Sequence, residues 1–391
     1  MRYIKNILYI WYHEFTNVMR DKGILVFVIL TPLFYPLLYA YVYTNEVVRE
    51  VPVAVVDESN SAISREFVRK TDATPDVRVC ATCRSMAEAE EFVKRQKAYG
   101  IMRIPSSFDK DLWYGKQTYI GLYCDMSSTL YYKALMIAVN NVSLEVNRKI
   151  KVEYLHCTTG RQEEITRMPI EYDYVTLYNP QGGYAAFLIP PVFMLIIHQM
   201  LLLGIGMSTG NTRERWHGSI IPFHLDYKNA FNIVIGKTLF YFLLFFLWGI
   251  YMFSIVTPCF GLPQLGDYAT FLAFLTPYLL ACISFAMVFS ALVYRREDCI
   301  LLFIFLSVPL LFLSGVSWPG VAIPPFWKYV SWLFPSTFGT NGYVRIQNMG
   351  VSLRDLSFEY YGLWIQAGVY FLLAVLLYRW QILRLLKRIS K

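Results

Sequence analysis

A short charged segment, TRERWHGSI (212–220), separates two long apolar stretches of this chain. Glu214 could pair with a basic group on a partner protein, and Trp216 could bury in the partner's surface as an anchor. Gly218 allows the backbone to turn sharply. The candidate docking residues are Arg213, Glu214, Arg215, Trp216 and Gly218. The alternative is a solvated loop whose positive charges only mark the inner side of a membrane.

A Cys-x-x-Cys pair, Cys80 and Cys83, could bind zinc or carry out redox chemistry. A zinc site needs a second pair of ligands, and none is evident, so we predict no metal site. A redox site needs the pair to open a helix after a strand, and Arg84-Ser85 does begin an expected helix. We favour the interpretation that the two cysteines form a structural disulfide or are thiols without a chemical role. Sequence alone cannot assign the pairing.

His198 and Gln199 are polar residues in the middle of an apolar stretch. Polar groups inside a membrane are costly and can mark a transport pathway. Satisfied hydrogen bonds between neighbouring helices would also explain them, and this is the interpretation that we favour.

Recognisable catalytic motifs are missing from the sequence. Gly236-Lys237-Thr238 resembles the end of a phosphate-binding loop, but position 231, where the first glycine belongs, is Phe231. H-E-x-x-H does not occur, and the one G-x-S-x-G match, Gly206 to Gly210, lies inside an apolar stretch and not at the turn after a strand where that motif belongs. We therefore predict no catalytic residues and no cofactor bound directly by this chain.

The composition indicates a membrane protein. Of the 391 residues, 56% are hydrophobic and only 16% are charged, whereas a soluble domain carries roughly 25% charged residues. The net charge of +8 does not indicate nucleic-acid binding, because residues 44–184 are nearly neutral, with 18 basic and 19 acidic side chains. The excess of Lys and Arg lies in the short segments beside the apolar stretches, where the positive-inside rule for membrane proteins places it.

The apolar stretches predict six transmembrane helices with both termini in the cytoplasm. The segments expected inside contain 15 Lys and Arg, and the two short segments expected outside contain 3. The first stretch is too long for a cleaved signal peptide and lacks an A-x-A site. The expected spans are residues 24–43, 185–207, 231–256, 269–293, 299–315 and 360–380.

Between the first and second spans, residues 44–184 alternate strand and helix patterns, which predicts an extracytoplasmic α/β domain. Residues 1–23 predict an amphipathic helix in the membrane interface, or else a helical extension of the first span. Residues 185–391 form a five-helix region with a cytoplasmic loop at 208–230. Within that region, the proline-broken segment 315–346 predicts a re-entrant hairpin on the outer side.

This order of elements resembles the membrane subunit of type-2 ABC exporters, in the drug-efflux group with a large outer domain. The family pattern R-E-x-x-x-G-T/S matches the residues from Arg213 to Ser219, and a following Gly-Lys matches Gly236-Lys237. A further pattern matches the hairpin at Ser314-Gly315, Pro319, Pro324 and Pro335-Ser336-Thr337. One departure is Ile220-Ile221-Pro222-Phe223, where the family has an acidic residue and an amide.

The resemblance implies that the charged segment is a coupling helix that docks on a separate ABC ATPase, which binds ATP and Mg²⁺. It adds Ser219 to the candidate docking residues. It implies a second copy or paralogue, the bacterial inner membrane and, in some systems, a periplasmic adaptor. Two alternatives remain open: a membrane sensor or enzyme with a ligand-binding outer domain, and a secondary transporter. The latter would favour internal repeats and carboxylates within the spans.

Overall fold

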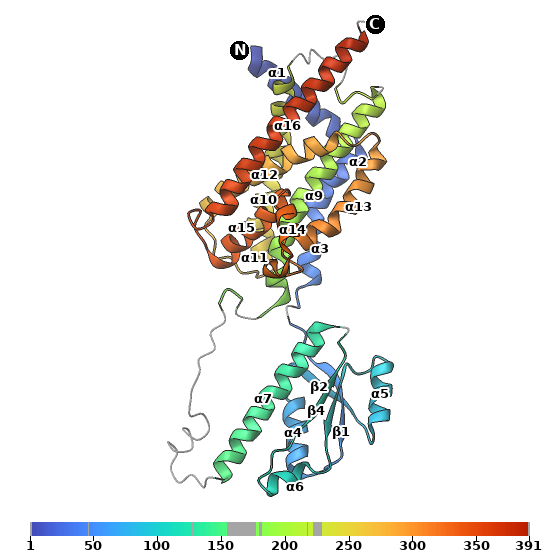
Figure 1. Ribbon diagram of the computed structural model, residues 1–391, viewed down its shortest axis with the longest axis vertical. Coiled ribbons are helices and arrows are strands. Elements are labelled where there is room, and N and C mark those ends of the chain that lie inside the picture. Colours follow the sequence, from blue (N-terminus) through green and yellow to red (C-terminus); the bar gives the residue numbers. More distant parts are fainter. Residues whose placement is uncertain are drawn as a thin grey trace. The chain divides into compact units, whose positions relative to one another are not determined.

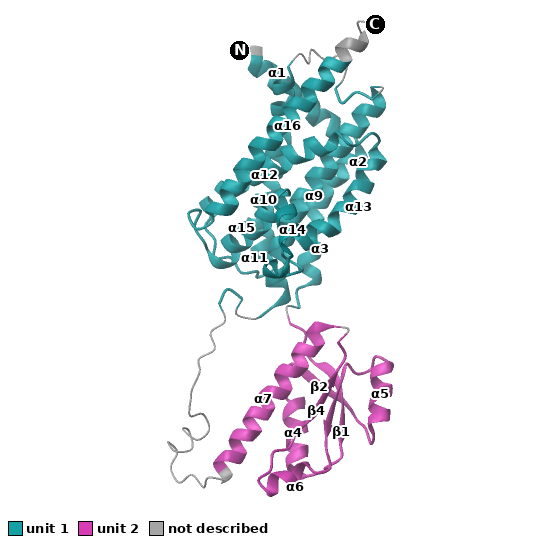
Figure 2. Cartoon of the chain, in the orientation of Figure 1, with its two compact units in different colours: residues 1–46, 176–391 teal, residues 47–175 magenta. Residues whose placement is uncertain are grey.

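The computed structural model describes residues 2–45, 47–126, 128–154, 177–179, 182–216, 218–221 and 229–389. The chain divides into two compact units (Figure 2). The helical unit comprises Met1–Glu46 and Thr176–Lys391, and the α/β unit comprises Val47–Val175.

The α/β unit is built on a four-stranded sheet of order β2-β1-β3-β4. The central strand β1 runs parallel to β2 and β3, and β3 runs antiparallel to β4. Its elements are β1 (Val51–Asp57), α4 (Ala62–Asp72), β2 (Val77–Thr82), α5 (Met86–Lys94), β3 (Gly100–Ile104), α6 (Phe108–Trp113), β4 (Gly121–Cys124) and α7 (Thr129–Tyr154). Strand–helix alternation therefore occurs where the sequence predicts it.

Helices cover both faces of this sheet (Figure 1). On one face, Val53 and Val55 of β1 pack with Phe67 of α4 and Leu135 of α7. On the other face, Ala54 and Val56 pack with Ala89 of α5. Because both faces of β1 are covered, the strand is an almost continuous apolar run, VPVAVVD, without the alternation of a half-exposed strand.

The helical unit is a bundle of helices, several of them long (Figure 1). In chain order its elements are α1 (Arg2–Arg20), α2 (Lys22–Leu25), η1 (Val26–Leu30), α3 (Thr31–Val42), α9 (Tyr184–Arg215), α10 (Ala230–Tyr251), η2 (Met252–Val256), α11 (Thr257–Cys259), α12 (Tyr268–Ser290), α13 (Arg296–Leu313), η3 (Gly320–Ala322), α14 (Pro325–Ser331), α15 (Pro335–Met349) and α16 (Ser357–Ile389).

Among the described residues, five helices are long and apolar enough to cross a membrane: Lys22–Val42, Tyr184–Arg215, Ala230–Cys259, Tyr268–Ser290 and Ser357–Arg384. The expected fifth span corresponds to α13, which is not among the five. Its 18 residues begin with Arg296, Glu297 and Asp298, so its apolar part is short. The six-span arrangement therefore stays a prediction, while five candidate spans are observed.

Helices α9 and α12 form the interior of the helical unit. Helix α9 packs against α3, α12, α13 and α15, and α12 packs against α9, α10, α15 and α16. The N-terminal helix α1 lies along α10. Its side chains Ile10, Glu14 and Val18 are buried, whereas Ile4 and Leu8 are exposed. The expected apolar face of α1 is thus divided between protein contact and an outward surface.

The proline-broken segment after α13 forms short helices, η3, α14 and α15. Most of α15 is buried in the helical unit, where it packs against α9, α12 and α16. The Asn348 side chain donates a hydrogen bond of 3.1 Å to the carbonyl oxygen of Ala186 in α9. The prolines explain the short helices, since proline cannot donate a helical hydrogen bond. A re-entrant position in the membrane stays a prediction.

Candidate functional site

The charged segment begins inside a helix. Helix α9 continues through Ser208 to Arg215, although the sequence predicts a loop from residue 208. The helix extends beyond the apolar stretch because its polar residues Ser208, Asn211 and Thr212 are buried among neighbouring helices and hydrogen-bonded there. Arg213, Glu214 and Arg215 thus form the last turn of a helix, and only the segment after them is non-helical.

A tight turn follows α9. The backbone N–H of Gly218 donates to the carbonyl oxygen of Arg213 at 2.9 Å, and the N–H of Ser219 donates to that of Trp216 at 3.0 Å. Gly218 has φ of +89°, a left-handed conformation that other residues rarely adopt. The buried Ser219 hydroxyl accepts a hydrogen bond from the N–H of Ile221 at 3.0 Å. His217 and residues 222–228 lie outside the described residues.

Arg213 is an internal residue, with 4% of its surface exposed. Its guanidinium donates to the carbonyl oxygen of Ala291 at 2.9 Å and to that of Val293, and it lies 4.8 Å from the centre of the Tyr294 ring. These contacts tie the end of α9 to the connection between α12 and α13. In this structure Arg213 positions the turn and does not face outward.

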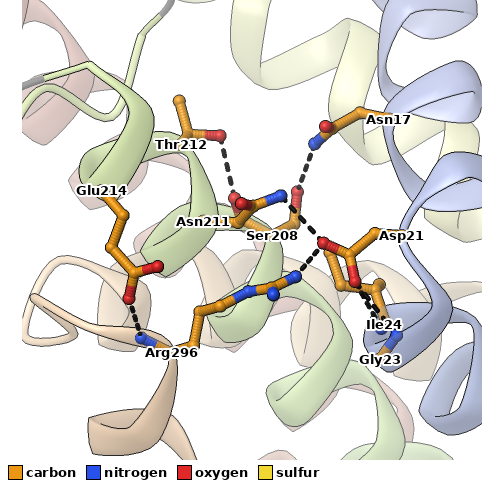
Figure 3. A network of polar contacts seen from close by, with 9 residues as sticks. All are labelled: Asn17, Asp21, Gly23, Ile24, Ser208, Asn211, Thr212, Glu214 and Arg296. Atoms are coloured by element: carbon orange, nitrogen blue, oxygen red, sulfur yellow. Dashed lines mark hydrogen bonds and ion pairs between the residues drawn. The ribbon is translucent and has the colours of Figure 1, made fainter.

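Glu214 joins α9 to α13. Its carboxylate accepts a hydrogen bond of 2.9 Å from the backbone N–H of Arg296, the first residue of α13 (Figure 3). A carboxylate at a helix N-terminus is favourable, because unpaired N–H groups and the helix dipole make that end positive. Glu214 and Arg215 are otherwise exposed, and Trp216 is half-buried. The outward surface of the turn therefore comprises Glu214, Arg215, Trp216 and Gly218.

Asp21 connects three helices at the same level (Figure 3). One carboxylate oxygen accepts hydrogen bonds from the N–H groups of Gly23 and Ile24, at 3.0 and 3.3 Å, and so caps α2. The other oxygen accepts a 2.9 Å hydrogen bond from the Asn211 amide and is paired with the Arg296 guanidinium. Asp21 therefore holds α2, α9 and α13 together.

Glu14 makes a second buried connection between α1, α9 and α10. Its carboxylate accepts hydrogen bonds from Ser208 at 2.8 Å and from Tyr241 at 3.0 Å, and it pairs with Lys237 at 3.2 Å. Burial by itself would raise the pKa of Glu14. The Lys237 ammonium, with the two hydroxyl donors, outweighs burial and holds that pKa below its ordinary value.

We call these residues the polar joint: the buried Glu14, Asp21, Ser208, Asn211, Lys237 and Tyr241 and the half-buried Arg296, with Glu214 at its edge. Gly236 permits the close packing of α1 at this joint. A Cβ atom there would lie 2.7 Å from Ile10 Cγ2 and 3.0 Å from the carbonyl oxygen of Ile7. The Gly-Lys pair thus has two structural roles, contact with α1 and ionic pairing.

Sequence reasoning missed the acidic partners in the polar joint. One usable signal was Lys237, because a cation inside an apolar helix requires a partner. Another was the spacing of Ile10, Glu14 and Val18, which places the carboxylate on a helical stripe with two apolar residues. Neither pattern identifies which acid meets which base.

The other candidate residues lie apart from this region. His198 is fully buried in α9 with its ring 5.3 Å from that of Phe285, and neither ring nitrogen has a hydrogen-bond partner among the described residues. Gln199 beside it is half-buried. Their role in a pathway stays a prediction.

Cys80 and Cys83 lie on β2 and just after it, and both are free thiols in this structure. Burial raises the pKa of Cys80, and burial together with Glu88 raises that of Cys83. Raised pKa values oppose formation of the reactive thiolate that redox chemistry needs. Their disulfide pairing stays a prediction.

These features define a multi-pass helical membrane protein with a separate α/β unit and a charged turn fixed to its polar joint. The sequence profile of the family described as "ABC-2 family transporter protein" matches residues 22–376. The chain belongs to this family, and it is a membrane subunit of the ABC transporter class.

Named relatives agree with this assignment. The chain is 24% identical over 354 residues to "ABC transporter G family member 20" of Dictyostelium discoideum, covering 87% of this chain and 46% of that protein. It is 21% identical over 323 residues to "Probable multidrug ABC transporter permease YbhR" of Escherichia coli K12, covering 82% of this chain and 84% of the relative. The O157:H7 strain has a relative of the same name with the same values. The chain thus spans less than half the length of the Dictyostelium protein.

Proposed function

We propose that this chain is the transmembrane subunit of an ATP-driven exporter, and that the turn after α9 docks on a separate ATPase subunit. The observation that carries the proposal is the anchoring of this turn inside a member of the ABC-2 family. Its outward side offers an acid, a base and an aromatic ring, Glu214, Arg215 and Trp216, which suit a protein interface. ATP and Mg²⁺ would be bound by the partner.

The contacts of the turn suggest how a push on it would act. Arg213 binds the connection before α13, and Glu214 binds the first residue of α13, so both fix the end of α9 to this helix. Asp21 links α2 to α9 through Asn211. A displaced turn would therefore carry α9, α13 and α2 together. Rigid movement of a packed group of helices is a common way to shift a protein between two states. An ATPase that binds the two states unequally would drive that shift.

The remaining parts of the proposal follow the family and the charge pattern. Six spans would make half a transporter, so the pathway would form between this chain and a second copy or paralogue. The positive-inside bias supports cytoplasmic termini, a cytoplasmic turn after α9 and an outer α/β unit. The bacterial inner membrane and a periplasmic adaptor stay predictions of the resemblance. An aromatic-rich membrane unit suits amphipathic cargo such as drugs, lipids or peptides.

Substitution of Gly218 tests the docking proposal. In Gly218→Pro the turn loses its left-handed residue and the N–H donated to Arg213, so the outward side chains are displaced. The matched control is Gly261→Pro, which changes another left-handed glycine whose N–H donates to Pro258, in the connection between α11 and α12. Both are tested by co-purification with an ATPase that carries a Walker motif and is encoded beside this chain.

We expect Gly218→Pro to abolish capture of the ATPase and cargo-dependent ATP hydrolysis, while Gly261→Pro retains capture. Equal capture by both variants, with export unchanged, would show that the turn is not the docking element. Loss of capture by both variants would also contradict the proposal, because it would make the effect a general consequence of disturbing a turn.

A further inference from the structure

A cavity of about 330 Å³ lies between α1 and the turn after α9. It is lined by residues of α1, of the end of α9 and the turn after it, and of α10. Its lining combines tyrosines, hydroxyl and amide groups, cations, one carboxylate and three isoleucines. The residues are Tyr9, Tyr12, His13, Glu14, Thr16, Asn17, Arg20, Thr212, Arg215, Trp216, Ile220, Ile221, Ile233 and Lys237.

The cavity carries positive charge. Glu14 and Lys237 form an ion pair, so their charges offset each other. Arg20 and Arg215 are exposed and make no salt bridge with any residue that the structure describes. Arg20 of α1 and Arg215 of α9 therefore line the same space. Guanidinium matches the geometry of phosphate oxygens, with which it forms paired charge-assisted hydrogen bonds.

The surface around this cavity is apolar. Helix α1 exposes Ile4 and Leu8, together with Tyr9 and Tyr12. An amphipathic helix of this kind lies in the boundary between lipid head groups and acyl chains. Arg20 comes two residues before the apolar helix Lys22–Val42. Basic and aromatic groups at the start of a span lie at the level of the head groups.

We propose that this cavity binds the phosphate head group of an anionic phospholipid, with its acyl chains along the exposed apolar side of α1. The cations bind the phosphate, and basic pockets between helices at the membrane surface suit such head groups. The site shares Arg215 and Trp216 with the docking proposal, but lipid binding needs only the helical unit and no ATPase. Since Arg215 and Trp216 also belong to the outward side of the turn, a bound lipid would hold that side in place.

The test is lipid retention by the purified full chain in a mild neutral detergent, measured by native mass spectrometry without an ATPase. The probes are dioleoyl phosphatidylglycerol, dioleoyl phosphatidylcholine and glycerol 3-phosphate. The variants are Arg20→Gln, Arg215→Gln and the double variant. Arg295→Gln is the matched control, because Arg295 is an exposed arginine of the helical unit that does not line the cavity.

We expect phosphatidylglycerol to bind the wild type and the Arg295→Gln control equally. Each of the two cavity substitutions should weaken binding about fivefold, the effect of removing one basic residue near an anionic membrane surface. Arg20→Lys should bind phosphatidylglycerol more tightly than Arg20→Gln and recover most of the lost affinity, because lysine keeps the positive charge. Unchanged thermal unfolding of the variants would show that the fold is intact.

Three results would overturn the inference. Equal binding of phosphatidylcholine would show that the anionic charge is not recognised. Equal binding of glycerol 3-phosphate would show that the site takes a free phosphate and not a lipid. Unchanged phosphatidylglycerol binding by the double variant would show that the two arginines do not bind the head group. Failure of the Gly218→Pro test would leave this lipid measurement unaffected, so the two proposals fail separately.

Discussion

The ion pair between Glu14 and Lys237 gives the sharpest prediction of stability. The two side chains are 6% and 9% exposed, and their charged atoms are 3.2 Å apart. In Lys237→Met the carboxylate remains buried with two hydroxyl donors, Ser208 and Tyr241, and no cation. Removing one partner of a buried pair typically costs about 3–5 kcal/mol, because an uncompensated charge is left. The two remaining hydrogen bonds place the expected loss near the lower end, about 3 kcal/mol.

A double-mutant cycle separates the pairing from loss of packing. In Glu14→Gln with Lys237→Met neither charge of this pair remains, and the glutamine oxygen can still accept from Ser208 and Tyr241. The expected loss is about 1–2 kcal/mol, the cost of an amide group left without partners. The double variant should therefore be more stable than Lys237→Met alone, which is the signature of coupled residues.

The measurement is the free energy of unfolding in mixed micelles, followed by tryptophan fluorescence. Of the nine tryptophans only Trp113 lies in the α/β unit, so the signal reports on the helical unit. A loss below about 1 kcal/mol in Lys237→Met would mean that water or a neighbouring group already screens the carboxylate. A double variant whose loss equals the sum of the two single losses would refute the ionic coupling itself.

The other predictions concern pH and packing. Because the pKa of Glu14 is lowered by folding, its stabilisation is complete above about pH 4.3, the unfolded value, and is lost as the pH falls through the folded pKa. The wild type should therefore lose stability in acid more steeply than Glu14→Gln, and parallel acid unfolding curves would exclude this role. Gly236→Leu should cost about 1–3 kcal/mol by forcing α1 away from α10, whereas Gly368→Leu, where no atom lies within 4 Å of the added Cβ, should cost little. Phe67→Ala should destabilise the α/β unit by about 3–5 kcal/mol and accelerate hydrogen exchange of the β1 amides, without changing the helical unit.

The anchored turn changes how the charged segment is interpreted. From its sequence, Arg213 is as suitable a contact for a partner as Arg215. In the structure Arg213 is buried against the connection before α13, while Arg215 faces outward. The two arginines therefore predict different phenotypes. Substitution of Arg213 should disturb the position of the turn, and substitution of Arg215 should affect its surface alone.

Local sequence patterns were enough to predict the features of this protein that depend only on residues close together in the chain. Apolar stretches of about 20 residues located the five helices that can span a membrane. The alternating strand and helix patterns located β1, β2 and β3 and the helices between them, because burial imposes a period of two or 3.6 residues. The charged turn after α9 was recognisable because charge is rare beside apolar stretches.

Tertiary structure alone decided what those residues do for one another. Asp21 and Arg296 lie 275 residues apart, and Glu14 lies 194 residues before Ser208. No local pattern encodes such pairs, since each depends on which helices pack side by side. Contacts between packed helices also explain why α9 continues past its apolar stretch. They explain, too, why α13, the expected fifth span, begins at charged residues that contact the polar joint. The sequence indicates where charge must be compensated, and only the packing of α1, α9, α10 and α13 decides by what.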